Sequence, residues 1–381
     1  MDQKFRIAVI FGGPSPEHDV SVISAQQLMD AVDTRKYEVI PVHLGFDTVF
    51  RTGASLRDVR RYRPLPPGLR EVTFAWGDAG PEMRGTGGQP PIRFDCALPV
   101  FHGFGEDGRI QGHFELLGIP VTGFSATHSG VAMRKDLTKT VVAAAGVNVV
   151  DQVVVRRGAE DASDWHAEVL ASFGLPAIVK PASLGSSIGV GLAKTQEELT
   201  HLTASVLRQD TVAVIEPQVQ NLQEYNVAVA KVGGEVICSA IERPKSGEEL
   251  LDYKTKYLSS NGGAKGALPS EGMLSLTRDI NPEMAPEMEA RVLDQAKAVF
   301  TALGARGAPR LDFMCDSKTG EIWFNEINPI PGSYGFFLWE ASRRNHLLFP
   351  ELVDHLVQEA LSAAPKPFDD PVPQDAYLLP R

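Results

Sequence analysis

The apolar positions in the first third of the chain form short runs that end in glycine-rich or polar turns. Residues 6–11 (RIAVIF) are one such run, and the two glycines that follow predict a buried strand entering a tight turn. Residues 37–42 and 96–101 have the same character and predict two further strands. Between them, residues 51–91 are rich in Arg, Pro and Gly without periodicity, which predicts a surface excursion.

A helix is predicted between the first two of these strands. Ser15 precedes Pro16 in an arrangement that commonly starts a helix. The buried stripe of this helix would consist of Val20, Ile23, Leu28 and Val32. Strands that alternate with a helix in this way predict an open parallel α/β domain, which we place at residues 1–125.

The rest of the chain alternates between helical and extended patterns. A helix is predicted over residues 129–145, because Gly146 offers a C-cap. A second domain, residues 126–222, is predicted to contain strands at 177–180 and 213–216 and a helix at 196–209. A third domain, residues 223–381, is predicted to contain strands at 226–232, 235–241, 310–314 and 321–325 and a helix at 286–303.

Composition places the chain among globular proteins, and the alternation of strands and helices predicts the α/β (α+β) class. With 381 residues, 43% of them apolar, it can bury a sizeable core in two or three domains. Its 37 basic and 48 acidic residues give a net charge of −11, which argues against a nucleic-acid partner or an anionic membrane. No apolar run reaches the roughly 18 residues of a membrane span. Cys96, Cys238 and Cys315 suit neither a disulfide framework nor a metal site, and predict a cytoplasmic protein.

Two glycine-rich loops, residues 12–16 and 182–191, carry hydroxyl side chains. Backbone N–H groups in such loops can approach phosphate, although a turn that needs positive φ is the alternative. Lys180 favours phosphate at the second loop. The nucleotide pattern GxxxxGK[ST] does not occur. Residues 185–189 match the GxSxG pattern of hydrolases, but too many residues separate Ser187 from the preceding strand for a nucleophile elbow.

Acidic and amide side chains alternate with apolar ones in two predicted strands near the C-terminus. The period of two places Arg310 beside Asp312 on one strand face, and Glu326 beside Asn328 on another. If the strands are adjacent, Asp312, Glu326 and Asn328 form an all-oxygen cluster that suits Mg²⁺. A solvated sheet face is the alternative. The apolar residues between these positions, such as Phe313, indicate that the opposite face is buried.

Several of these segments together resemble the D-alanine–D-alanine ligase family of the ATP-grasp superfamily. The resemblance covers nearly the whole chain and is carried by residues 11–21 (FGGPSPEHDVS), 102–112 (HGFGEDGRIQG), 133–139 (MRKDLTK), 180–189 (KPASLGSSIG), 252–258 (DYKTKYL) and 325–332 (NEINPIPG). It implies a three-domain ATP-grasp fold. The central and C-terminal domains would hold ATP between them, and the N-terminal domain would supply the first amino-acid site.

The resemblance also implies a reaction. ATP phosphorylates the carboxylate of the first amino acid to an acylphosphate, and the amine of a second amino acid attacks it. The products are a dipeptide, ADP and phosphate. The implied cofactors are ATP and Mg²⁺, with two ions expected and Mn²⁺ as a substitute. The implied partners are small amino-acid substrates and a second copy of the chain in a homodimer.

Site roles follow from the same resemblance, position by position. The nucleotide site would consist of Lys135, Lys180, Ser187 and Lys256 at the phosphates, Glu216 at the adenine and Glu224 at the ribose. The metal ligands would be Asp312, Glu326 and Asn328. Substrate binding and catalysis would fall to Glu17, His102, Ser186, Tyr257, Lys256, Arg310, Gly332, Phe337 and Leu338. Among these, Glu17 would bind the ammonium of the first amino acid, and Arg310 with the N–H of Gly332 would stabilise the oxyanion.

The chain departs from the family pattern mainly at the acceptor site. Phe337 stands where the family has a Ser that grips the carboxylate of the second amino acid, and a phenyl ring cannot donate a hydrogen bond. This predicts a rebuilt acceptor pocket, with aromatic packing of the C-terminal domain as the alternative. Arg134 and Leu184 replace acids that are usual in their motifs, and Phe104 alone fills a gap in which the family has two residues.

We therefore expect an ATP-dependent ligase that joins two small amino acids, similar to D-alanine–D-alanine ligase but with a diverged acceptor site. A D-alanine–D-alanine ligase of peptidoglycan precursor synthesis is the first alternative. A noncatalytic homologue that binds nucleotide without turnover is the second.

Overall fold

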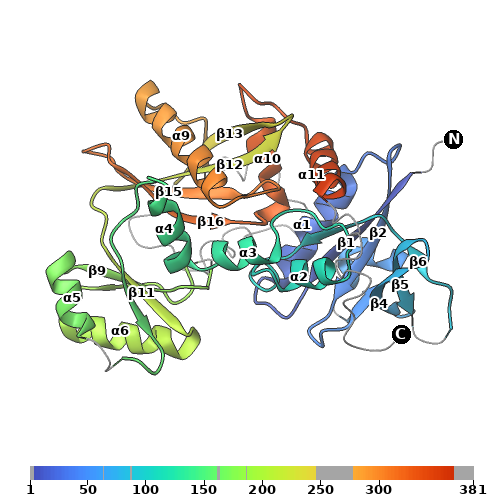
Figure 1. The fold of residues 1–381 in the computed structure, drawn as a ribbon, viewed down its shortest axis with the longest axis horizontal. Coiled ribbons are helices and arrows are strands. Elements are labelled where there is room, and N and C mark those ends of the chain that lie inside the picture. The colour runs from blue at the N-terminus through green and yellow to red at the C-terminus, as the bar shows by residue number, and fades with distance from the viewer. Residues whose placement is uncertain are drawn as a thin grey trace, which may run out of the picture.

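The computed structural model describes residues 4–62, 64–85, 88–160, 164–185, 187–245 and 278–363. These residues form three sheets with helices packed on them, an α/β fold as expected (Figure 1). In Figure 1 the N-terminal sheet lies at the right, the central sheet at the lower left and the C-terminal sheet between them. Within these ranges, no helix is long and apolar enough to cross a membrane.

The N-terminal sheet has seven strands in the order β6-β5-β4-β3-β2-β1-β7. Only β1 (Phe5–Gly12), β2 (Tyr37–Leu44) and β7 (Cys96–Val100) pair in parallel, as predicted. The surface excursion predicted for residues 51–91 is wrong, because this region adds antiparallel strands to the sheet. These are β3 (Phe50–Thr52), β4 (Arg70–Gly77), β5 (Gly80–Gly85) and β6 (Ile92–Arg93), with short 3-10 helices at Ala54–Arg57 and Val59–Arg61.

The first strand ends in a turn that requires glycine. Gly12 has a φ of +97°, and a Cβ there would lie 2.5 Å from the carbonyl oxygen of Leu44. Helix α1 (His18–Ala31) begins after this turn, slightly later than predicted. Ser15 does not cap it, because the Ser15 hydroxyl donates to the His102 carbonyl and accepts from the Glu17 N–H. The predicted buried stripe is wrong at Ile23, which is 45% exposed.

Replacing Gly12 with Ala should destabilise the protein, because the new methyl group meets backbone in a conformation that L-residues rarely adopt. We expect the free energy of unfolding in urea to fall by about 2–4 kcal/mol. The control is Gly158→Ala, where φ is +80° but nothing lies within 4 Å of the added Cβ, so only the φ strain remains. Equal losses for the two variants would contradict the steric argument.

The central sheet has four antiparallel strands in the order β10-β9-β11-β8. They are β8 (Val153–Arg156), β9 (Ala177–Pro181), β10 (Gly191–Ala193) and β11 (Val212–Pro217), with helices α5 (Trp165–Ser172) and α6 (Gln196–Gln209). Helix α6 has the predicted bounds. The single helix predicted over 129–145 is wrong, because the extended backbone of Arg134 separates α3 (Ala126–Ala132) from α4 (Lys135–Ala144).

The C-terminal sheet has five antiparallel strands in the order β14-β13-β12-β15-β16. They are β12 (Leu222–Val232), β13 (Glu235–Pro244), β14 (Arg278–Ile280), β15 (Arg310–Asp316) and β16 (Ile322–Asn328). Helix α9 (Pro286–Ala302) covers one face through Val292, Ala296 and Val299, as the pattern predicts.

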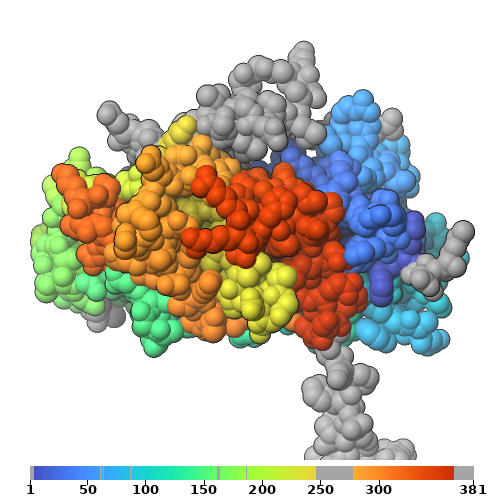
Figure 2. All heavy atoms as spheres, turned by 90° about the horizontal axis from the view of Figure 1, so that it is seen from above, coloured from blue at the N-terminus to red at the C-terminus, as the bar shows by residue number. Residues whose placement is uncertain are grey.

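The segment after β16 returns to the N-terminal domain. It contains a 3-10 turn at Gly332–Gly335 and helices α10 (Phe336–Glu340) and α11 (Phe349–Ala363). The 3-10 turn and α11 both contact α1. Another helix of the N-terminal domain is α2 (Arg109–Leu116). Tyr334 donates to the Pro99 carbonyl at 2.7 Å, and Tyr37 donates to Asp354 at 2.6 Å. Figure 2 shows the red C-terminal residues against the blue N-terminal ones. The N- and C-terminal parts therefore share one hydrophobic core.

Candidate active site

Lysine side chains connect the central sheet to the last strand of the C-terminal sheet. Lys180, on β9, donates to Asn325 Oδ1 on β16 at 3.0 Å. Lys135, at the start of α4, lies 3.1 Å from Glu326 Oε2 on the same strand. Lys135 and Lys180, which are predicted to bind the nucleotide phosphates, thus both contact β16. This strand carries two of the predicted metal ligands, Glu326 and Asn328.

The predicted metal ligands lie together on β15 and β16. Asp312 pairs with Glu326 in the strand register, and Asn328 donates to Asp312 Oδ2 at 3.1 Å. Two carboxylates and an amide on adjacent strands are a donor set that suits Mg²⁺, so these residues fit the ion that the sequence implies. Among the described residues, no group of three or more His, Cys, Asp or Glu side chains could hold a metal ion. The cluster on β15 and β16 is not such a group, because its third member is the amide of Asn328.

Arg310 lies directly beside this cluster. Its guanidinium donates to both oxygens of Asp312, each at 2.7 Å. Burial alone would lower the pKa of Arg310, but the Asp312 carboxylate raises it well above the usual value. Burial would likewise raise the pKa of Glu326, but the ammonium groups of Lys135 and Lys180 lower it to about 2. Both side chains are therefore charged at neutral pH.

Glu216 lies on β11 between two lysines. Lys180 Nζ is 2.7 Å from Glu216 Oε2, and Lys139 ion-pairs with Oε1. Burial would raise the pKa of Glu216, but the two ammonium groups lower it. Lys139 is not among the residues predicted from the sequence, although Lys139 lies one helical turn after Lys135 in the segment 133–139 that carries the family resemblance.

Two departures from the family pattern have a place in this site. Leu184 accepts a hydrogen bond from Lys135 Nζ at 2.7 Å through its carbonyl, a contact that any residue type can make. Arg134 forms a two-point ion pair with Asp136, at 2.7 and 2.9 Å.

Two further residues predicted for the nucleotide site differ in exposure. Ser187 is exposed with a φ of +58°, and Glu224 lies half-buried near the start of β12.

Glu17 lies beside Gly103, the residue that follows His102, in the N-terminal domain. Gly103 approaches so closely that a Cβ there would lie 2.8 Å from Glu17 Oε2. Glu106, which sequence reasoning missed, accepts a hydrogen bond from the Gly103 N–H. Burial, with the nearby Glu17 charge, raises the pKa of Glu106 to about 8. The sequence did contain a signal for Glu106, because Glu106 belongs to the segment 102–112 that carries the family resemblance.

The Ser24 hydroxyl joins this region to the C-terminal segment. It lies 3.1 Å from His102 Nε2 and accepts from the Ser333 N–H at 3.3 Å. Burial lowers the pKa of His102 to about 4, with a further contribution from Arg310. Gly332, the residue before Ser333, is exposed. Glu17, His102 and Gly332, three of the residues predicted for the amino-acid site, thus lie where the N-terminal and C-terminal parts meet.

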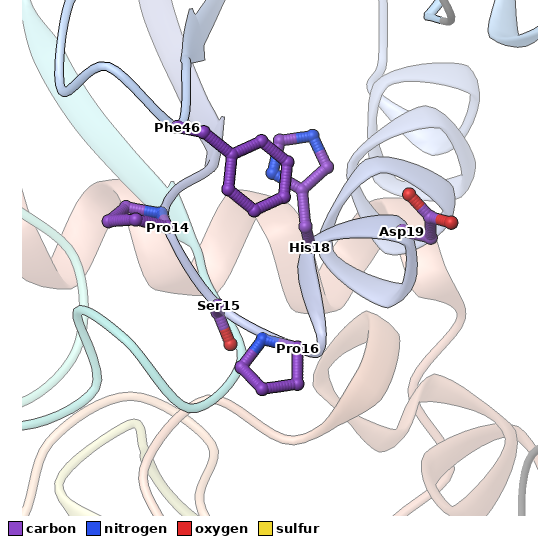
Figure 3. Close-up of a pocket in the computed structure, with 6 residues that line it drawn as sticks. All are labelled: Pro14, Ser15, Pro16, His18, Asp19 and Phe46. Atoms are coloured by element: carbon purple, nitrogen blue, oxygen red, sulfur yellow. The ribbon is translucent and has the colours of Figure 1, made fainter.

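A shallow cavity of about 340 Å³ adjoins the glycine-rich turn. Pro14, Ser15, Pro16, His18, Asp19 and Phe46 line it. Figure 3 shows the rings of His18 and Phe46 stacked above the turn, with centroids 4.5 Å apart. His18 Nδ1 lies 2.8 Å from the Gly13 carbonyl, which holds the turn that leads into Glu17.

The predicted acceptor residues differ in their exposure. Phe337 is half-buried, and the Arg278 guanidinium lies 5.1 Å from the centre of its ring. Leu338 is wholly buried in the hydrophobic core, so its side chain packs rather than facing solvent. Ser186, Lys256 and Tyr257 lie outside the described residues.

The central and C-terminal sheets, bridged by Lys180 beside a carboxylate and amide cluster, have the ATP-grasp fold of the solved structures that this chain matches. Family models described as "D-ala D-ala ligase N-terminus" and "D-ala D-ala ligase C-terminus" match residues 6–124 and 141–358. The chain therefore belongs to the D-alanine–D-alanine ligase family, whose members are ATP-dependent, ADP-forming ligases.

Curated relatives and solved structures agree with this assignment. D-alanine–D-alanine ligase of Chlorobium phaeovibrioides is 33% identical over 93% of this chain and 96% of its own. D-alanine–D-alanine ligase A of Bradyrhizobium diazoefficiens is 32% identical over 95% and 96%. Among structures, VanG D-Ala:D-Ser ligase of Enterococcus faecalis has a TM-score of 0.76 at 28% identity, covering 94% of this chain and all of that one. The D-alanine–D-alanine ligase of Coxiella burnetii has a TM-score of 0.77 at 26% identity, with 94% of each chain covered.

Proposed function

We propose that this enzyme activates D-alanine with ATP and joins it to the amine of a second small amino acid. A carboxylate oxygen of the first amino acid attacks the γ-phosphorus of ATP, and ADP leaves. The amine of the second amino acid then attacks the acyl carbon, loses a proton, and expels phosphate. The observation that carries the proposal is a pair of contacts, from Lys135 to Glu326 and from Lys180 to Asn325. They support the proposal because cations suited to phosphate lie beside groups suited to a metal ion.

Nucleotide binding would draw on residues of α4, β9, β11 and β12 and on two further residues, Ser187 and Lys256. In the proposal, the phosphates meet Lys135, Lys180, Ser187 and Lys256, the adenine meets Glu216 and the ribose meets Glu224. Asp312, Glu326 and Asn328 would hold Mg²⁺, as two ions that Mn²⁺ could replace. Mg²⁺ supplies neutralisation of the charge on the transferred phosphoryl group. Lys135 and Lys180 would orient the phosphates.

The first amino acid would bind beside the turn after β1. Glu17 would hold its ammonium group, together with Ser186, Tyr257 and the buried His102. Arg310 and the Gly332 N–H would donate to the oxygen that becomes negative when the amine adds to the acyl carbon. Donors fixed in advance at such an oxygen contribute strongly to catalysis. The two-point contact with Asp312 fixes the Arg310 guanidinium in this way.

The acceptor site would differ from that of a ligase for two D-alanines. Phe337 cannot hold a carboxylate by hydrogen bonding, and its ring lies against Arg278 instead. The match to an enzyme named as a D-Ala:D-Ser ligase supports an acceptor site that can vary on this fold. We propose an acceptor other than D-alanine, with simple packing of Phe337 as the competing explanation.

Phosphate release tests this function. Purified enzyme is given ATP, Mg²⁺ and D-alanine alone, then with other amino acids as second partner, and products are identified by mass spectrometry. Little dipeptide from D-alanine alone, with release restored by another amine, supports the proposal. Rapid formation of D-alanyl-D-alanine would contradict the diverged acceptor. No amino-acid-dependent release with any partner would contradict the ligase reaction.

Replacing Phe337 with Ser should improve use of D-alanine as acceptor, because the hydroxyl supplies a donor for the carboxylate. We expect kcat/KM for D-alanine as acceptor to rise roughly tenfold, about the value of one hydrogen bond to a charged group. Phe337→Leu is the control, since it removes the ring without adding a donor. An unchanged acceptor preference in Phe337→Ser would remove this residue from the acceptor site.

We further propose that the enzyme acts in the cytoplasm as a homodimer. The three cysteines are free and buried, which suits a reducing compartment. The homodimer rests on the family resemblance, and sedimentation of the purified enzyme tests it.

A further inference from the structure

Lys139 is a lysine whose side chain is completely buried. It lies on α4 and forms an ion pair with Glu216 on β11, 77 residues further along the chain. A buried ammonium is costly unless it is paired, and removal of one partner leaves the other charge uncompensated. The fold therefore maintains this ion pair although burial of the two charged groups costs free energy.

The two lysines on Glu216 differ in what else they reach. Lys180 contacts Oε2 of Glu216 and also Asn325, next to the predicted metal ligand Glu326. Lys139 contacts Oε1 and is shielded from solvent, so it cannot itself reach a phosphate. Lys180 thus divides its hydrogen bonds between Glu216 and the phosphate region. Lys139 is the partner of Glu216 that does not depend on the phosphates.

Glu216 has a chemical reason to need such a partner. A charged carboxylate only accepts hydrogen bonds, whereas a protonated carboxyl group also donates one. Adenine presents an amino group at its 6-position, and hypoxanthine presents a carbonyl oxygen there. A carboxylate therefore favours adenine, and loss of its charge would reduce this preference.

We propose that Lys139 is a positioning residue that keeps Glu216 charged and fixed, and so sets the preference of the nucleotide site for adenine over 6-oxopurines. The inference rests on the proposed function, in which Glu216 meets the adenine. Lys139 acts through Glu216 alone and touches neither nucleotide nor amino acid. Burial lowers the pKa of Lys139 and the Glu216 carboxylate opposes this shift, so each group sustains the charge of the other.

The test compares binding of ATP and inosine triphosphate, both with Mg²⁺, by calorimetry. In Lys139→Met, affinity for ATP should fall roughly 10- to 100-fold, as expected when one partner of a buried pair is removed. Affinity for inosine triphosphate should fall much less, so the ratio of the two affinities shrinks. Lys194→Met, which removes an exposed lysine of the same domain, should leave both affinities unchanged. A purely structural role would weaken both nucleotides equally, and that result would overturn the inference.

The double variant with Glu216→Gln separates the remaining cases. Glutamine can donate or accept, so Glu216→Gln should discriminate poorly, and adding Lys139→Met should change its affinity ratio no further. If Lys139→Met alone does not fold, a folded double variant with the ratio of Glu216→Gln supports the inference. A different ratio, or failure of the double variant to fold, overturns it. If the wild-type enzyme binds ATP and inosine triphosphate equally well, the inference alone is refuted. If the wild-type enzyme binds neither nucleotide, the proposed function is refuted as well.

Discussion

Glu326→Gln is expected to lower kcat by roughly a thousandfold or more, since the charge stabilisation that a bound metal ion provides is worth several kcal/mol. The substitution keeps the size of the side chain but removes the charge that faces Lys135 at 3.1 Å. It also leaves Asp312 as the only carboxylate of the proposed metal site. The measurement is amino-acid-dependent ADP release at saturating ATP, with calorimetry of ATP binding at several Mg²⁺ concentrations.

The matched control is Glu321→Gln, an exposed acid just before β16. It should retain wild-type kcat and the wild-type Mg²⁺ dependence of ATP binding. Full activity in Glu326→Gln would contradict the metal assignment. Lost activity with an unchanged Mg²⁺ dependence would place Glu326 in catalysis but outside the metal site.

Arg310→Met should lower kcat by roughly a hundredfold to a thousandfold, the effect of removing one donor from an oxyanion site. The guanidinium is fixed by both oxygens of Asp312, so its position is set before substrates bind. Arg310→Lys keeps the charge but loses the two-point contact, and should fall between Arg310→Met and the wild type. Steady-state kinetics with varied amino acid measures kcat and KM separately.

Arg156→Met, at an exposed position on β8, is the control for loss of an arginine. It should leave kcat unchanged. If Arg310→Met raised only the KM for ATP, Arg310 would serve nucleotide binding through Asp312 rather than the oxyanion. Wild-type kinetics in Arg310→Met would exclude both roles.

The adjacency of the proposed metal ligands could be predicted because strand geometry constrains it. Alternation with a period of two puts Asp312 and Glu326 on defined faces, and adjacent strands then bring them together. The antiparallel register does pair these residues directly. Helix α6 could be predicted for a similar reason, because Leu199, Leu202 and Leu207 follow the helical period.

Other features depend on contacts that no local pattern carries. The strands between residues 51 and 91 are short and interrupted by Arg, Pro and Gly, and they form because Val72 and Phe74 pack into the N-terminal core. The break at Arg134 places Lys135 where its backbone N–H donates to the Ala182 carbonyl at 2.9 Å. The pairing of Lys139 with Glu216 likewise requires that the fold bring α4 and β11 within reach of one lysine side chain, which the sequence does not specify locally.

The central claim is that the first amino acid is activated by transfer of phosphate to its carboxylate. Amino acid labelled with oxygen-18 in the carboxylate tests it directly, with mass spectrometry of the phosphate released during dipeptide formation. The proposed route predicts one labelled oxygen in each phosphate, because the bond between the acyl carbon and that oxygen breaks when the amine attacks. Unlabelled phosphate, formed at the same rate as dipeptide, would contradict the acylphosphate and with it the proposed reaction.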